Sequence, residues 1–358
     1  MNDLVIVKIL TKKPYQIVIG SSIFYKIFTL TKKNHRVILF HQKISIQLAV
    51  YIQKYLTNGG IDIYRFEIPD AEIAKELSVV GFMWEALGRI NISKSDCLIS
   101  LGGGTVNDAV GFVSATWLRG IDIIHIPTTL IGMVDATIGG KTGINTSISK
   151  NLVGSFYQPA AVIVDLTLIK TLPHNLILDG IAEIVKIGFV IDPTILNLID
   201  INSKKVDSIV SILPALIHRS VVAKSIVVAI DENDSHLRTS LNYGHTLAHA
   251  IERNEHYKWS HGKAVSVGLI FASELSRRSR SLDIYTWHRH HKILNSLGLP
   301  VNYCSSALTK LIYYMLSDKK IQSGALRFIL LDSIAKPSIL EKPEVHLLKS
   351  SYTEMSYK

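Results

Sequence analysis

The chain has 358 residues, of which 47% are hydrophobic and 19% charged, and this composition predicts a folded protein large enough for two domains. The 39 Lys and Arg residues exceed the 29 Asp and Glu residues, which gives a net charge of +10, but the basic residues are scattered and argue against a nucleic-acid-binding surface. Cys97 and Cys304 form no CxxC pair, so neither a disulfide framework nor a thiolate zinc site is indicated.

The chain begins with MNDLVIVKIL, which lacks the basic-then-apolar pattern and the cleavage site of a signal peptide. No segment approaches eighteen uncharged apolar residues, so we expect no membrane span. Together with the unpaired cysteines, these features predict a cytoplasmic protein that binds neither membranes nor nucleic acids.

The first half of the chain alternates short apolar runs, rich in β-branched residues, with stretches that suit helices. We predict strands at residues 37–40, 97–104, 122–129 and 161–165. This alternation is typical of βαβ units on a parallel sheet. From about Leu168 the segments lengthen and take helical spacing. We therefore expect an α/β domain over residues 1–167 and a mainly α-helical domain over residues 168–358.

Three glycines, Gly102, Gly103 and Gly104, follow one predicted strand and precede a predicted helix. Glycines at such a turn let backbone N–H groups approach a phosphate, and the helix N-terminus adds a favourable dipole. The pattern is not GxGxxG, so a simple tight turn is the alternative. Thr128 and Thr129 follow the next strand, at the edge where open α/β sheets bind ligands. Two such loops on adjacent strands favour a cofactor site.

A Gly-, Lys- and Asn-rich stretch extends from Val134 to Asn151 with little helical or strand periodicity. Lysines in a loop are ordinarily solvated. Lysines among glycines beside a cofactor loop are also suited to clamp an anion, and both interpretations stay open.

In the helical half, Glu183 and Lys186 lie three residues apart in an apolar segment and would share one helix face. A carboxylate there is either paired or a ligand, because an unpaired buried charge is costly. An ordinary surface ion pair is the alternative.

Four polar residues spaced by four, three and four would form one stripe on a continuous helix: Arg238, Asn242, His245 and His249. A solvated stripe would more typically carry Lys and Glu, so this set indicates a lined site. His245 and His249 have the spacing of a zincin pair, but Thr246 stands where HExxH needs its glutamate. The metalloprotease interpretation therefore fails. His261 comes at the start of another helix, where a ligand can point into a cleft.

The motifs together resemble the 3-dehydroquinate synthases, which are sugar-phosphate cyclases. The resemblance extends from about Tyr15 to Leu331 and rests on these segments, in this order: GGGTVNDAVGF, LRGID, PTTLIGMVDATIGGKTGIN, SKNLVGSFYQP, GIAEIVKIG, LRTSLNYGHTLAHAIE, HGKAVSVG and DKK. It implies a Rossmann-like NAD domain followed by a helical metal- and substrate-binding domain, with one active site in the cleft, in a homodimer. It also implies NAD, one divalent zinc or cobalt ion, and conversion of 3-deoxy-D-arabino-heptulosonate 7-phosphate to 3-dehydroquinate and phosphate.

The resemblance assigns roles residue by residue. The metal ligands would be Glu183, His245 and His261, whereas His249 would lie beside the departing phosphate without binding the metal. The substrate contacts would be Asp135, Lys141, Asn151, Lys186, Lys224, Arg238, Asn242, His249, Lys320 and, from the neighbouring subunit, Arg119. Lys and Arg suit a substrate that carries a carboxylate and a phosphate. The NAD contacts would be Glu72, Lys75, Gly102, Gly103, Gly104, Asp108, Thr128 and Thr129.

This sequence departs from the family pattern at a few positions. His41 stands where an acidic residue would hold the adenosine ribose, and we expect NAD rather than NADP because no arginine accompanies the change. Lys263 replaces the Glu of HGEAV, Asn107 replaces a Gly, and Ala71 and Ser149 replace glycines.

Three alternatives remain on this sequence. One is another cyclase, of the 2-deoxy-scyllo-inosose or 2-epi-5-epi-valiolone synthase type. Another is a metal-dependent alcohol or glycerol dehydrogenase, which would release NADH. The third is a catalytically impaired relative, for which Lys263 beside His261 is the best argument.

Overall fold

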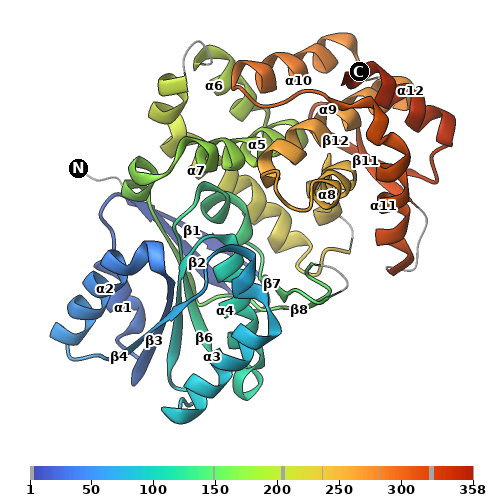
Figure 1. Cartoon of the computed structure of the whole chain (residues 1–358). Coiled ribbons are helices and arrows are strands. Elements are labelled where there is room, and N and C mark those ends of the chain that lie inside the picture. Colours follow the sequence, from blue (N-terminus) through green and yellow to red (C-terminus); the bar gives the residue numbers. More distant parts are fainter. Residues whose placement is uncertain are drawn as a thin grey trace. The chain divides into compact units, whose positions relative to one another are not determined.

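The computed structural model describes residues 4–147, 150–202, 206–235, 237–280, 282–321 and 326–357. Within these ranges, the side chains of residues 206–207 and 317–321 are not described. Contacts divide the chain into two compact units (Figure 1). The first unit is Met1–Leu176 with Lys224–Asn233, and the second is Ile177–Ala223 with Asp234–Lys358. A functional boundary at residues 167 and 168 stays a prediction.

The first unit is built on a seven-stranded sheet in the order β1-β2-β9-β6-β5-β3-β4. Every pair is parallel except the antiparallel edge pair β1 and β2. The strands are β1 (Val5–Ile9), β2 (Tyr15–Gly20), β3 (Arg36–Gln42), β4 (Asp62–Ile68), β5 (Cys97–Gly102), β6 (Asp122–Pro127) and β9 (Ala161–Asp165). The four strands predicted from apolar runs are all present, because strands covered on both faces carry continuous apolar sequence.

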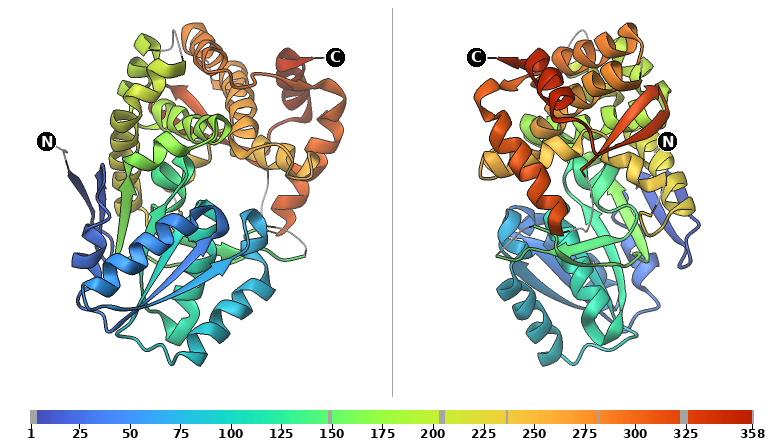
Figure 2. Two further views of the ribbon diagram at one scale, coloured as in Figure 1. Left: turned by 60° about the vertical axis from the view of Figure 1, so that its left-hand side comes forward. Right: turned by 90° about the vertical axis from the view of Figure 1, so that its right-hand side faces the viewer.

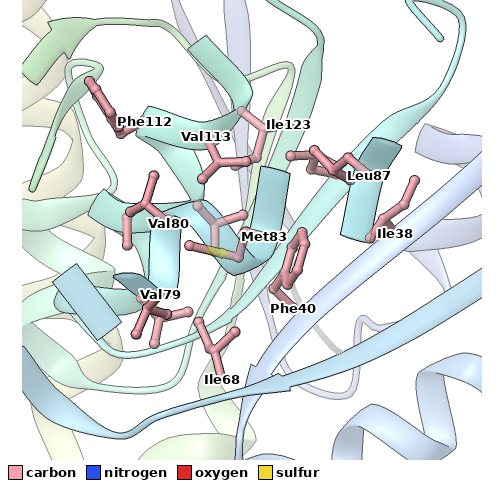
Figure 3. Packing of buried hydrophobic residues seen from close by; sticks show 14 of the residues in the cluster. Ile38, Phe40, Ile68, Val79, Val80, Met83, Leu87, Phe112, Val113 and Ile123 are labelled. Atoms are coloured by element: carbon pink, nitrogen blue, oxygen red, sulfur yellow. The ribbon is translucent and has the colours of Figure 1, made fainter. Parts of the chain in front are cut away.

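Helices cover both faces of this sheet, and alternate strand residues belong to different cores. Ile38 and Phe40 of β3 pack with α3 (Leu77–Arg89) and α4 (Gly104–Thr116), as Figure 3 shows. Val37 and Leu39 pack on the opposite face with α1 (Lys26–Thr31) and α2 (Ile46–Asn58). The period of two along β3 thus places one residue on each side in turn. The result is the predicted doubly wound α/β unit.

Shorter elements complete the first unit. The Gly-, Lys- and Asn-rich stretch contains an antiparallel hairpin of β7 (Lys141–Ile144) and β8 (Val153–Phe156), so part of it is regular after all. The remaining short elements are η1 (Lys43–Ser45), η2 (Ala71–Lys75), η3 (Trp117–Arg119), the single π-turn η4 (Gly132–Ala136) and η5 (Leu166–Thr171).

The second unit is mainly helical, as predicted. Its helices are α5 (His174–Val190), α6 (Pro193–Asn202), α7 (Val206–Ile230), η6 (Leu237–Asn242), α8 (His245–Asn254), α9 (His261–Arg280), α10 (Ile284–Ser296), η7 (Ser305–Ala307), α11 (Leu308–Ile321) and α12 (Val345–Met355). Helix α5 begins in the first unit, and helix α7 ends in it. A hairpin of β11 (Arg327–Ser333) and β12 (Lys336–Glu341) is the red strand pair in Figure 2. A short parallel pair joins β10 (Tyr303–Cys304) to β13 (Ser356–Tyr357).

The predicted continuous helix from Arg238 to His249 is wrong. Arg238 lies in the 3₁₀ helix η6, and α8 begins only at His245. Between them Gly244 has a φ of 80°, a left-handed conformation that ends one helix and that glycine adopts without strain. A Cβ at Gly244 would lie 2.8 Å from the backbone nitrogen of Leu269, so α9 also approaches too closely for a side chain. Of the four stripe residues, only His245 and His249 share a helix.

One helix in the described part of the chain is long and apolar enough to span a membrane by composition, over Ser208–Ile230 of α7. This segment carries two charged residues with acidic partners. Arg219 donates to Asp192 at 2.7 Å, and Lys224 pairs with Asp135 at 2.6 Å. A helix with 56% of that window buried and its charges paired is typical of a protein core.

Candidate functional site

Glu183 is the centre of a buried polar cluster in the second unit. It lies on α5 with no exposed surface, and Lys186, one turn later on the same face, is only 2% exposed. The Lys186 Nζ atom lies 2.5 Å from Glu183 Oε2, so the pair is buried and not the surface ion pair that was the alternative. Burial would raise the pKa of Glu183, but Lys186 and the two neighbouring histidines hold it well below its ordinary value. The carboxylate is therefore ionised and available as a ligand.

Two histidines from different helices face the other carboxylate oxygen. His261 Nε2 lies 2.9 Å from Glu183 Oε1, and His245 Nε2 lies 3.3 Å from the same atom. Each begins its helix, α9 and α8 respectively. Burial would lower the pKa of His261, but hydrogen bonds to Glu183 and Glu252 outweigh it and raise the pKa to about 10.

The Nδ1 atoms of both histidines are bonded to acceptors. His245 Nδ1 lies 3.1 Å from the carbonyl oxygen of Tyr243, and His261 Nδ1 lies 3.3 Å from Glu252 Oε1. With the Nδ1 of each ring bonded to an acceptor, Nε2 is the atom that faces Glu183 and that would bind a metal in place of a proton, which is the arrangement of metal-binding histidines. Glu252 was not predicted from the sequence, although it follows His249 by three residues and therefore lies on the same face of α8 as His245 and His249.

The three predicted metal ligands come together. Ligand atoms of Glu183, His245 and His261 all lie within 4.8 Å of one another, and no further group of this kind occurs in the described ranges. One carboxylate and two imidazoles, with their outer hydrogen bonds in place, fit a divalent zinc or cobalt ion. Three protein ligands would leave positions open for a substrate.

The predicted substrate residues of the second unit lie close to this cluster in sequence but differ in burial. Arg238 is 2% exposed, whereas Asn242 and His249 are exposed. The rings of His245 and His249 are 5.5 Å apart and nearly perpendicular. His249 is not a member of the ligand trio. The side chain of Lys320 lies outside the described residues.

In the first unit the two predicted cofactor loops lie side by side. Gly102 and Pro127 end the paired strands β5 and β6, and the Thr128 N–H donates to the Gly102 carbonyl at 2.9 Å. The Gly132 N–H in turn donates to Thr129 Oγ1 at 3.2 Å. Helix α4 begins at Gly104, so its free N–H groups lie at the same edge of the sheet. The two loops therefore share one edge of the sheet, and a cofactor site there stays a prediction.

A buried polar chain lies beneath the glycine loop. The His125 Nδ1–H donates to Ser100 Oγ at 2.7 Å, Ser100 donates to Asn107 Oδ1 at 2.8 Å, and the Asn107 amide donates to the Gly102 carbonyl at 3.2 Å. With these directions, each bond of the chain has one donor and one acceptor. Burial lowers the pKa of His125 to about 3, so the ring is neutral. Asn107, a departure from the family pattern, therefore stabilises this loop.

Several predicted NAD and substrate residues of the first unit form a second network. Lys75 Nζ lies 2.6 Å from Asp108 Oδ2 and also bonds to Asn151 Oδ1. Glu72 accepts from Asn145 at 2.6 Å and pairs with Lys150 at 3.1 Å. The network joins η2, α4 and the segment between β7 and β8. It brings Glu72, Lys75, Asp108 and Asn151 together.

The remaining predicted residues of the first unit occupy three different places. Lys224 donates to both the carboxylate and the backbone oxygen of Asp135, at 2.6 and 2.7 Å. Lys141 is exposed at the start of β7. Arg119 is exposed in η3 with a φ of 62°.

The structure corrects the argument that no arginine accompanies His41. Arg65, on the neighbouring strand β4, places its Nη1 2.8 Å from His41 Nε2. Since the arginine donates, His41 carries its proton on Nδ1, which donates to the Gln42 carbonyl at 2.8 Å. Both ring nitrogens are then used within the protein. Gln42 Oε1 accepts from the Gly103 N–H at 3.4 Å, so the Gln42 side chain lies against the glycine loop.

Comparison with known proteins decides the family. Residues 65–179 match the model of the 3-dehydroquinate synthase N-terminal domain, and residues 180–321 match that of the C-terminal domain. The 3-dehydroquinate synthase of Mycolicibacterium gilvum is 53% identical over 357 residues, which covers 99% of each chain. The chain belongs to the 3-dehydroquinate synthase family.

Solved structures agree with this fold. 2-epi-5-epi-valiolone synthase from Streptomyces hygroscopicus subsp. jinggangensis, with NAD+ and Zn2+ bound, has a TM-score of 0.87 at 22% identity and covers 98% of each chain. 2-deoxy-scyllo-inosose synthase, complexed with carbaglucose-6-phosphate, NAD+ and Co2+, has a TM-score of 0.85 at 22% identity, covering 98% of this chain and 100% of that one. The predicted fold class is thus confirmed. The much higher identity to 3-dehydroquinate synthases favours that family member over either alternative cyclase.

Proposed function

We propose that the chain converts 3-deoxy-D-arabino-heptulosonate 7-phosphate to 3-dehydroquinate and phosphate, as a lyase with NAD and one divalent metal ion. The reaction proceeds by transient oxidation, phosphate elimination, reduction and intramolecular aldol closure. The observation that carries the proposal is the Glu183, His245 and His261 trio, in which both Nε2 atoms face the carboxylate, in a chain 53% identical to a 3-dehydroquinate synthase over nearly its whole length.

When bound, the metal would act as a Lewis acid toward a substrate hydroxyl, and NAD would accept and return a hydride. The protein's own contribution is to orient and to balance charge. Lys186 keeps Glu183 ionised, and Glu252 and the Tyr243 carbonyl fix the two imidazole orientations.

The substrate carries a carboxylate and a phosphate, and the proposed contacts are correspondingly basic. Lys141, Lys186, Lys224, Arg238 and Lys320 supply positive charge, while Asn151 and Asn242 can donate hydrogen bonds to oxygen atoms. Asp135, held by Lys224, can accept from a substrate hydroxyl. We assign His249 to the region of the departing phosphate, and Arg119 to the substrate site of a neighbouring subunit in a homodimer. Positioning and electrostatics of this kind need no dedicated general base.

We assign NAD to the edge of the first unit's sheet. The pyrophosphate would lie against Gly102, Gly103, Gly104 and the N-terminus of α4, with Thr128 and Thr129 beside it. Glu72, Lys75 and Asp108 would complete the nucleotide contacts. The absence of a disulfide among the described residues, with Cys97 buried and Cys304 unpaired, supports a cytoplasmic location.

Incubation of the purified protein with the heptulosonate phosphate, NAD and zinc or cobalt tests the proposal. We expect one phosphate released for each 3-dehydroquinate formed, with no net gain of NADH absorbance. Net NADH would instead indicate a dehydrogenase. A different carbocycle from a different sugar phosphate would indicate another cyclase, and bound metal without phosphate release would indicate an impaired relative.

A further inference from the structure

The N-terminus of α9, which carries His261, meets the backbone of α5 at Asp179. A Cβ on Gly262 would lie 2.3 Å from the Cα of Asp179 and 2.8 Å from its backbone oxygen, so the two backbones meet with no room for a side chain. Asp179 precedes Glu183 by four residues and therefore lies one helical turn before it on the same face of α5.

Asp179 also bonds to α9 directly. Its Oδ1 accepts from the Gly262 N–H at 3.2 Å. The first N–H groups of a helix have no partner within the helix, and a carboxylate there also interacts favourably with the helix dipole. Asp179 is only 6% exposed, so this bond forms away from bulk water. A residue of α5 thus performs the role of a capping residue for α9.

Lys263, the departure from the family pattern beside His261, follows Gly262 directly and is exposed. The bond from the Gly262 N–H to Asp179 forms with this lysine in the sequence.

We propose that Asp179 is a positioning residue of the metal centre: by capping α9 through Gly262 it holds His261 Nε2 against Glu183 Oε1. The proposal rests on the proposed function, in which Glu183, His245 and His261 bind the metal. Two residues one turn apart on α5 then fix the start of α9. Asp179 does so by its hydrogen bond to Gly262, and Glu183 does so by sharing the metal with His261. A cap that only stabilised the fold would not change the metal's surroundings.

The test measures metal binding on the full-length protein without relying on activity. Asp179→Ala removes the acceptor and the charge, and Asp179→Asn keeps an oxygen that can accept from Gly262. Asp283 provides a matched control, because it caps α10 in the same unit by accepting from the Thr286 N–H at 2.8 Å. For each variant, the dissociation constant of Co2+ is measured by chelator competition, and the visible spectrum of the Co2+ form is recorded.

We expect Asp179→Ala to weaken Co2+ binding about tenfold and to shift the cobalt bands, as loss of an outer-shell partner does. Asp179→Asn should recover most of the affinity, and Asp283→Ala should change neither quantity. If Asp179→Ala does not fold, Asp179→Leu, which keeps a side chain of similar shape but has no acceptor atom, takes its place with the same expected loss. A dissociation constant within twofold of wild type and an unshifted spectrum in a folded Asp179→Ala or Asp179→Leu protein would overturn the inference.

Glu183→Gln separates this inference from the proposed function. If Glu183→Gln binds Co2+ as tightly as wild type, the metal assignment itself fails. If Glu183→Gln loses the metal while a folded Asp179→Ala keeps it unchanged, only the role of Asp179 is wrong.

Discussion

The two units of this chain present their polar groups in different ways. In the sheet unit, the candidate site consists mainly of backbone amides and side chains at the ends of β5 and β6; Lys141 is exposed, and Lys75 is buried against Asp108. In the helical unit, charged groups are buried within helices: Glu183 is fully buried, and Lys186 and Arg238 are 2% exposed. A sheet edge provides a binding site through its backbone geometry. A helical unit must instead bury ionised side chains, and it can do so only where partners are supplied.

The largest effect should come from breaking such a partnership in the helical unit. Lys186→Met leaves the Glu183 carboxylate buried beside two imidazoles without its ammonium partner, and should lower the free energy of unfolding of the metal-free protein by about 3–5 kcal/mol. In the sheet unit, Arg89→Ala removes an ion pair with Glu85 whose side chains are 81% and 70% exposed. This substitution should change the free energy of unfolding by less than about 0.5 kcal/mol. Urea denaturation of the metal-free proteins gives both values. Equal losses would contradict the contrast between the units.

One proposed substrate contact from each unit gives the next prediction. Lys224→Ala in the first unit and Arg238→Ala in the second should each reduce kcat/KM about 30- to 1,000-fold. This corresponds to a loss of about 2–4 kcal/mol of transition-state stabilisation, because a charged hydrogen bond to the substrate is lost. Steady-state kinetics with the heptulosonate phosphate measures this. Wild-type kcat/KM in both variants would mean that the substrate contacts are misassigned.

Each unit also buries a neutral histidine whose pKa burial lowers to about 3, so both units should lose stability in acid. Burial lowers the pKa of His125 in the first unit to about 3, and of His290 in the second to about 3 as well. In the unfolded chain these histidines have a pKa of about 6.5 and take up protons below that pH, whereas in the folded chain they do not. Stability is therefore present in full above that pH and falls as the pH drops, by about 1.4 kcal/mol per pH unit for each histidine.

Hydrogen exchange of residues 122–127 and 284–296 at pH 7.5 and 5.0 separates the two units. His125→Gln should weaken the pH dependence only in the first segment, and His290→Gln only in the second. A pH dependence that neither substitution changes would show that these histidines do not titrate as described.

The smallest effect concerns cofactor choice. Both nitrogens of His41 are used by Arg65 and Gln42, so the side chain left near the glycine loop is the neutral amide of Gln42. A neutral amide repels the 2′-phosphate of NADP less than a carboxylate would. We therefore expect only a modest preference for NAD over NADP. Gln42→Asp should increase this preference, because it places a negative charge near the glycine loop. The concentrations of each cofactor for half-maximal turnover decide this. If NADP supports turnover at lower concentration than NAD, the assignment is wrong.

Much of the sheet unit could be predicted from the sequence, because fully buried strands and the turns after them are local patterns. Strands β1, β2 and β4 were not predicted, since β4 mixes polar and apolar residues and the edge pair has no neighbouring helix pattern. The buried chain from His125 to Asn107 also escaped notice, because its members are far apart in sequence and meet only through strand pairing.

The helical site was less accessible to reasoning from spacing. His245 and His249 are the nearest pair in sequence, yet the ligand atoms that meet belong to Glu183, His245 and His261 on three different helices. Only the family resemblance indicated that set. Gly244 interrupts the helix that spacing predicted, and Asp179 and Glu252 act through contacts between helices, which no local pattern reveals.

The central claim is that His245 pairs with His261 and Glu183 rather than with His249. Metal analysis of three purified variants tests it most directly. We predict that His245→Ala and His261→Ala each lose tightly bound metal and activity together, whereas His249→Ala keeps nearly one metal per chain and turns over far more slowly, with the loss at or before phosphate release. A metal-free His249→Ala protein beside a metal-replete His261→Ala protein would contradict the account and return the site to the pair on α8.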